Sequence, residues 1–170
     1  MRYHNITHDD MKNGDGIRVV LWVAGCEHHC PECQNPQTWD SESGIPFKID
    51  DWYEIQEELS KDYVAGITFS GGDPLAPYNK YEVERLVQLI RLIFGDSKTI
   101  WIYTGYTFEQ LIQANDPTLN SILSNIDILV DGEYKKELRN TNLKWRGSSN
   151  QRVIDVKKSL AENKVVLWCD

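Results

Sequence analysis

From Ile17 to Asn35 the chain reads IRVVLWVAGCEHHCPECQN, an apolar run that leads directly into three closely spaced cysteines. Residues 17–24 are mostly branched or aromatic, which predicts a buried β-strand. Cys26, Cys30 and Cys33 follow in a C-x3-C-x2-C arrangement, so one loop can present three thiolates to one metal centre. On a four-iron cube, three protein ligands leave one iron open, and open metal positions are where chemistry takes place.

Outside this stretch, apolar β-type runs alternate with segments of helical periodicity. Further strands are predicted at 65–70, 99–103, 126–130, 152–156 and 165–168, and helices at 49–59, at 83–94 with a stop at Gly95, and from Phe108 to a break at Asp116-Pro117. This alternation predicts βαβ units and a mainly parallel sheet. A full eight-unit barrel takes ~250 residues. The 170-residue chain therefore predicts an α/β fold, an incomplete (βα) TIM-type barrel with about five or six mostly parallel strands, in a single domain over residues 1–170.

In such folds ligands collect at the carboxyl ends of the strands. The cysteine loop and three further polar segments are predicted there, namely Gly71-Gly72-Asp73, Thr104-Gly105 and Asp131-Gly132. The two glycines at 71 and 72 let the backbone approach a ligand closely, and Asp73 can accept a hydrogen bond from a ligand ammonium. Gly-Gly-Asp-Pro by itself is also an ordinary tight turn, but its place after a strand favours the functional interpretation. Tyr103 and Thr104 suit either a nucleoside pocket or plain strand-end packing.

The composition limits the classes of partner. The net charge is −8, which disfavours binding to nucleic acid. A membrane or secreted protein is not predicted, because the sequence has neither a run of ~20 apolar residues nor a signal-peptide core. We therefore expect a cytoplasmic protein with reduced cysteines. Cys169, far from the other three, is interpreted as a spare thiol.

One basic segment stands out against the acidic total. It is either a solvated loop or a contact to an acidic partner or carboxylate-bearing ligand. Its residues are Lys135, Lys136, Arg139, Lys144, Arg146 and Arg152.

Three single residues leave alternatives open. Arg18 lies inside an apolar strand, where its guanidinium can pair with a carboxylate or, at an edge position, can reach water. His28 and His29 could join the cysteines in a structural zinc site, as could Cys169, but the second half of a paired zinc motif is missing. An iron–sulfur cluster is therefore the favoured centre, with both histidines as loop residues that shield it.

Taken together, these motifs resemble the radical S-adenosylmethionine (SAM) superfamily. Its cysteine motif follows the first strand here, and Gly71-Gly72-Asp73-Pro74 follows a second. Within the superfamily the chain is similar, over nearly its whole length, to the anaerobic ribonucleoside-triphosphate reductase-activating proteins. The narrower resemblance rests on the short length and on several runs: Asp15-Gly16-x-Arg18, Cys33-x-Asn35, Trp101-x-Tyr103-Thr104-Gly105-Tyr106, Asp131-Gly132 and residues 145–152, WRGSSNQR.

The resemblance implies a mechanism. Cys26, Cys30 and Cys33 would hold a [4Fe-4S] cluster whose open iron binds SAM, and a 5′-deoxyadenosyl radical would then take a hydrogen atom from a glycine of the large reductase. No side chain would act as a catalytic group, and a low-potential electron donor is required. The implied SAM contacts are Glu32, Cys33, Gln34, Gly71, Gly72, Asp73, Tyr103 and Thr104. Glu32 departs from the family pattern, which often has an aromatic residue there.

Two other functions fit the same motifs less closely. Another radical SAM enzyme, either a formate-lyase-type activase or one that modifies a small molecule, would present a similar site. A zinc-stabilised binding module would use the cysteines without catalysis, but it leaves the glycine turns and the strand-end polar residues unexplained.

Overall fold

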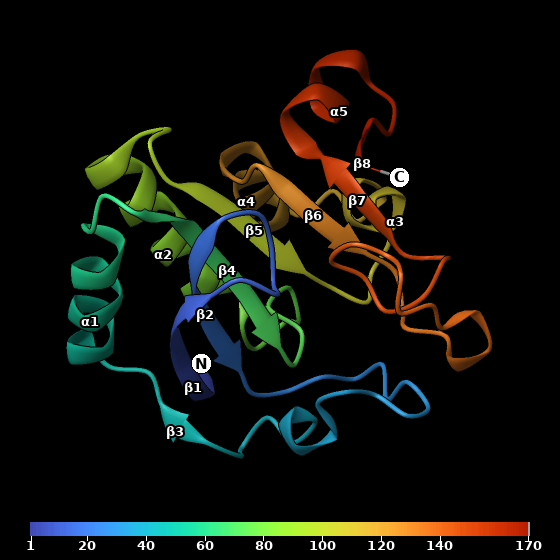
Figure 1. The fold of residues 1–170 in the computed structure, drawn as a ribbon, viewed down its shortest axis with the longest axis horizontal. Helices are drawn as coiled ribbons and strands as arrows, with labels where there is room; N and C mark the ends of the chain where they lie inside the picture. The colour runs from blue at the N-terminus through green and yellow to red at the C-terminus, as the bar shows by residue number, and fades with distance from the viewer. Residues whose placement is uncertain (170) are drawn as a thin grey trace.

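All strands of the computed structural model, which describes residues 1–169, belong to one sheet in the order β3-β1-β2-β4-β5-β6-β7-β8 (Figure 1). The strands are β1 (Arg2–Asp10), β2 (Ile17–Val23), β3 (Ile45–Pro46), β4 (Val64–Gly71), β5 (Thr99–Tyr103), β6 (Ile128–Asp131), β7 (Arg152–Asp155) and β8 (Leu167–Cys169). The central strands β2, β4, β5 and β6 pair in parallel, whereas the pairs at both flanks are antiparallel.

Helices connect the parallel strands, as the alternation in the sequence predicts, and one further helix lies between β7 and β8. They are α1 (Ile49–Leu59), α2 (Lys80–Phe94), α3 (Phe108–Gln113), α4 (Pro117–Asn125) and α5 (Val156–Glu162), with short 3-10 turns η1 (Pro36–Thr38) and η2 (Lys136–Leu138). The predicted break at Asp116-Pro117 is present, since the Asp116 carboxylate caps α4 by accepting from the Thr118 and Leu119 amides. None of these described helices has the length and apolar character needed to cross a bilayer.

Two strands were not predicted from the sequence. β1 is largely half-exposed and carries polar and charged residues, so it lacks the continuous apolar run that marks the central strands. β3 has only two residues, and its Pro46 suits a sheet edge because proline cannot donate to a strand ladder. The described part of the chain therefore forms a sheet of eight strands, four of them parallel, where five or six strands were expected. Its description as an incomplete barrel stays a prediction.

The two faces of the sheet have different compositions. One row of aligned residues runs across five strands, is fully buried and belongs to the main apolar core: Leu21, Phe69, Ile102, Leu129 and Ile154. The alternate row, on the opposite face, contains Thr68 and Trp101. Toward the carboxyl ends of the parallel strands, this second face presents Trp22, Ser70 and Tyr103 to a cavity. The alternation of side chains along each strand thus separates core from site.

Arg18 fits neither alternative that the sequence left open. Its side chain is fully buried on the second face, and among residues 1–169 its guanidinium donates only to hydroxyls and carbonyls. The acceptors lie at 2.8–2.9 Å on Thr68, Thr99, Ile67 and Asp15. Burial lowers the pKa of Arg18 to about 10, so the group stays charged at neutral pH. Arg18 therefore joins β2, β4 and β5 beneath the site.

We predict that Arg18→Met destabilises the protein by about 3 kcal/mol, because the change leaves several buried acceptors without a donor. Urea unfolding of the anaerobic protein measures the difference. Arg85→Met is the matched control, since exposed Arg85 pairs only with Glu82 on the surface of α2 and its loss costs at most about 1 kcal/mol. Equal costs for the two variants would contradict a structural role for the buried guanidinium.

Candidate functional site

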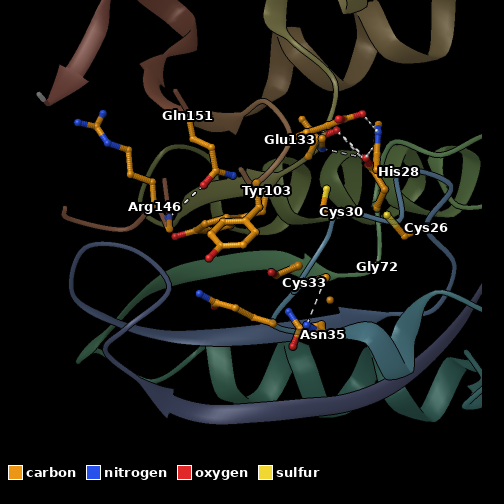
Figure 2. A pocket seen from close by; sticks show the side chains of 18 of the residues that line it. Cys26, His28, Cys30, Cys33, Asn35, Gly72, Tyr103, Glu133, Arg146 and Gln151 are labelled. Carbon is orange, nitrogen blue, oxygen red and sulfur yellow. Dashed lines mark hydrogen bonds and ion pairs between the residues drawn. The ribbon is translucent and has the colours of Figure 1, made fainter. Parts of the chain in front are cut away.

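A cavity of about 370 Å³ opens at the carboxyl ends of the parallel strands (Figure 2). The four segments expected at these ends contribute the cysteine loop after β2, Ser70 to Asp73 at the end of β4, Tyr103 to Gly105 at the end of β5, and Gly132 and Glu133 after β6. In Figure 2 the three cysteines surround one end of the cavity, while Tyr103, Gln151 and Arg146 lie toward the other. These segments therefore meet at one cavity, as predicted from the strand order, except that Asp131 does not line it and instead pairs with Arg152.

The cysteine loop is fixed at its start by close backbone packing. Gly25 has a φ of +96°, and a Cβ there would lie 2.3 Å from the ring of Tyr78. The Gly25 amide donates to the Thr38 carbonyl at 2.6 Å, and the Cys26 amide donates to the Trp39 carbonyl at 3.0 Å. Only glycine combines this conformation with this contact, so Gly25 determines the direction in which the loop leaves β2.

The glycine turn after β4 packs directly on the cysteine loop. The Gly72 amide donates to Val23 and the Asp73 amide to Gly25, both at 2.8 Å. A Cβ on Gly72 would lie 2.3 Å from the Gly25 carbonyl oxygen, so the two backbones leave no room for a side chain. This turn is thus a structural support of the cysteine loop as well as part of the cavity wall.

The Asp73 carboxylate is buried and accepts hydrogen bonds from three segments of the chain. Its partners are the Leu75 amide, the Thr104 hydroxyl, the Gly105 amide and the His28 ring, at 2.7–3.0 Å. A buried carboxylate is stable only when such donors surround it. Asp73 therefore already connects the turn, the cysteine loop and the end of β5. Its predicted contact with a ligand ammonium stays a prediction.

The two histidines of the cysteine loop point to different places. His28 bonds Asp73 through Nε2 at 2.7 Å and Glu133 through Nδ1 at 3.0 Å, and its ring packs edge-on against Tyr106. The hydrogen bond with Asp73 is the main cause that raises the pKa of His28. His29 instead packs against Trp39 and does not line the cavity. His28 thus ties the cysteine loop to the ends of β4 and β6, a role that the sequence did not reveal.

The three thiols fit an iron–sulfur cluster by their chemistry and setting. All three line the cavity, and the Asn35 amide points at the Cys33 sulfur at 3.3 Å, as backbone amides do toward cluster thiolates. Burial raises the pKa of Cys26 to about 11 and also raises that of Cys30. Such thiols are poor free nucleophiles, whereas a bound metal deprotonates them. Within residues 1–169, no three His, Cys, Asp or Glu side chains converge on one point as ligands of a single ion would. In a four-iron cluster each thiolate would bind a separate iron, so the three sulfurs need not meet at one point.

Most of the predicted SAM contacts line this cavity. They are Cys33, Gln34, Gly71, Gly72, Asp73, Tyr103 and Thr104. Glu32 does not line it. The Glu32 backbone has a φ of +57°, and the exposed carboxylate forms an ion pair with Lys136. The roles of all eight residues toward SAM stay predictions.

A further wall of the cavity comes from the connection between β6 and β7, which the predicted site omitted. Besides Gly132 and Glu133, six of its residues contribute: Tyr134, Leu143, Trp145, Arg146, Gly147 and Gln151. The Gln151 side chain accepts from the Gly147 and Ser148 amides and donates to the Gly132 carbonyl, which fixes this wall to the end of β6. The sequence signal was the run WRGSSNQR at 145–152, which lies in a loop without periodicity.

Arg146 is the cation of this wall. Its Nε atom is buried without a hydrogen-bond partner among the described residues. A buried donor left unsatisfied costs about 1–3 kcal/mol, so an anionic group of a bound molecule would stabilise this arrangement.

Comparison with known proteins agrees with this chemistry. The chain belongs to the family described as "4Fe-4S single cluster domain", whose model matches residues 12–154. It is 42% identical over 153 residues to the anaerobic ribonucleoside-triphosphate reductase-activating protein of Enterobacteria phage T4, covering 90% of this chain and 93% of that protein. The proteins of the same name from Escherichia coli (strain K12) and Vibrio cholerae are 41% and 39% identical, over 90% and 89% of this chain and 97% and 96% of their own lengths.

These relatives define the particular family. The chain belongs to the anaerobic ribonucleoside-triphosphate reductase-activating proteins, and the resemblance noted in the sequence is confirmed.

We predict that His28→Leu weakens iron retention about tenfold, because loss of a residue that orients a metal-binding loop typically costs 10–100-fold in metal affinity. His28→Gln keeps one donor toward Asp73, so its iron retention should fall between that of His28→Leu and that of the wild type. Iron release to a chelator under anaerobic conditions measures the effect.

The matched control is His29→Asn, which changes the neighbouring ring and keeps a residue that tolerates the φ of +47° at this position. Its iron release should stay within about twofold of the wild type, because the effect follows from bonds to Asp73 and Glu133, whereas His29 packs on Trp39. Equal iron release from His28→Leu and the wild type would show that the bonds to Asp73 and Glu133 do not hold the loop.

Proposed function

We propose that this protein activates an anaerobic ribonucleoside-triphosphate reductase by cleaving SAM reductively at a [4Fe-4S] cluster and generating a glycyl radical on the reductase. The observation that carries the proposal is the cavity itself, which brings three thiols of one loop together with the glycine turn and the strand-end hydroxyls. The printed names of relatives that match nearly the whole chain support the same activity.

Residues of this chain can hold both groups. Cys26, Cys30 and Cys33 would bind the cluster, leaving one iron without a protein ligand. The amide of Asn35 would donate to the Cys33 sulfur, as it does in the present structure. Toward SAM, the carbonyls and amides of the turn at 71–73 offer backbone contacts, and Tyr103 and Thr104 line the adjoining wall.

When bound, the cluster and SAM would supply the one-electron chemistry that removes a hydrogen atom from a glycine of the reductase. The chain contributes binding, orientation and shielding. His28 and Asp73 hold the cysteine loop in place, and Trp145 and Leu143 form an apolar part of the wall that limits the access of water. An incomplete barrel would leave a lateral opening through which a loop of a protein partner can enter.

Two further parts of the proposal follow from the reaction. A low-potential electron donor must reduce the cluster, and no nucleic acid or membrane is needed. A cytoplasmic location agrees with four reduced cysteines.

The test is anaerobic reconstitution with iron and sulfide, followed by dithionite reduction with SAM. We predict that the wild type forms 5′-deoxyadenosine and methionine and that Cys30→Ala loses both the four-iron spectrum and this cleavage, because one ligand of the cluster is missing. Cys169→Ala is the control, since Cys169 lies outside the cavity, and it should keep both.

Three results would contradict the proposal. The first is an intact four-iron spectrum in Cys30→Ala, and the second is reduced wild-type protein that leaves SAM uncleaved. The third is about one equivalent of zinc without sulfide in protein purified anaerobically, which would favour a binding module. A glycyl radical formed on a formate-lyase-type enzyme, and none on the reductase, would change the substrate within the same chemistry.

A further inference from the structure

The charges of this acidic protein are separated along the chain. Residues 134–152 contain six of the 18 basic residues and only one of the 26 acidic residues, Glu137. The remainder of the chain is therefore strongly acidic. Such separation gives one region a field opposite in sign to that of the whole molecule.

Only part of this positive charge is used inside the protein. Arg152 pairs with Asp131 and Glu109, and Lys136 pairs with Glu32. Within residues 1–169, no ion pair involves Lys135, Arg139, Lys144 or Arg146. The first three of these side chains are exposed, and exposed Leu138 lies among them in the sequence. We call residues 134–149 the basic loop.

The basic loop is a folded platform. Arg139 and Ser148 form an isolated antiparallel bridge, and the Ser149 amide donates to the Leu138 carbonyl at 2.9 Å. The Ser148 hydroxyl accepts from the Lys135 amide at 3.1 Å. Because these bonds fix the backbone, less conformational entropy is lost when the exposed side chains meet a partner.

The platform adjoins the cavity. Its residues Tyr134, Trp145 and Arg146 line the cavity wall, and Lys136 reaches Glu32 on the cysteine loop. Figure 1 shows the loop between β6 and β7 extending on the same side of the sheet as the loop that follows β2. The exposed cations therefore belong to the same loop that forms this wall of the cavity.

We infer that the basic loop is the docking surface for an acidic face of the protein that presents its glycine to the cavity. The inference rests on the proposed function and adds to it the surface and the charge of the partner. A protein suits this surface better than a nucleic acid for two reasons. The acidic remainder of the chain repels an extended polyanion, and an exposed leucine among the cations matches the mixed character of a protein interface.

The experiment reverses two exposed charges that do not line the cavity. Lys135→Glu with Arg139→Glu should weaken binding to the anaerobic reductase of the same organism by about tenfold or more at low salt, with a smaller difference at high salt. Anaerobic titration at two salt concentrations gives the affinity, and the glycyl radical signal gives the activation. Iron content and SAM cleavage without the reductase should stay within about twofold of the wild type, because both charges act on association alone.

The matched control is Lys158→Glu with Lys164→Glu, which makes the same change in net charge at two well-exposed side chains on and after α5. Its affinity for the reductase should stay within about twofold of the wild type. Wild-type affinity in the loop variant, or an equal loss in the control, would overturn the inference. So would displacement of the reductase by a single-stranded 20-mer DNA that binds the loop more tightly. Failure of the proposed function would appear separately, as absence of SAM cleavage in the wild type.

Discussion

The buried Asp73 carboxylate is the interaction on which the site depends. It collects donors from the cysteine loop, from its own turn and from the end of β5, and its amide donates to Gly25. A carboxylate at 1% exposure is stable only while those donors stay in place. Moving any one of the donating segments would therefore destabilise the charge that also holds the other segments. The cysteines therefore occupy a loop whose position is set by protein contacts.

The division of the sheet into two faces explains how a chain of this size holds both a core and a cavity. Side chains on one face meet the helices, while those on the other include a buried arginine, two threonine hydroxyls that accept from it and, at the strand ends, the cavity lining. Parallel pairing brings all four carboxyl ends to one edge. The cysteine loop, which lies within the residues matched by the single-cluster family, follows β2 at that edge.

The central elements could be predicted because their signals are local. Residues 17–23, 64–71 and 99–103 are dense in branched and aromatic side chains, and Gly95 and Asp116-Pro117 are strong helix boundaries. β1 was missed because its residues are largely polar and half-exposed, so it has no continuous apolar run. The site could be predicted where it follows a strand end, as at Gly71, Gly72 and Thr104.

Contacts between distant segments could not be predicted in this way. The bonds of His28 to Asp73 and Glu133 span 45 and 105 residues, and the acceptors of Arg18 lie on two other strands. No local pattern encodes such distances. Glu32 shows the converse case, since its place in a recognised motif did not reveal that its side chain faces Lys136.

The three cysteines lie within eight consecutive residues of one loop. The chain can therefore fold before the cluster is inserted. In a zinc finger the metal joins segments that are otherwise apart, and its removal unfolds the domain. Within residues 1–169, no two strands or helices are joined through the thiols alone, because the sheet and Asp73 already connect them. A chain stripped of iron by air would keep its architecture, so repair would require new iron and sulfide and no new synthesis of the polypeptide.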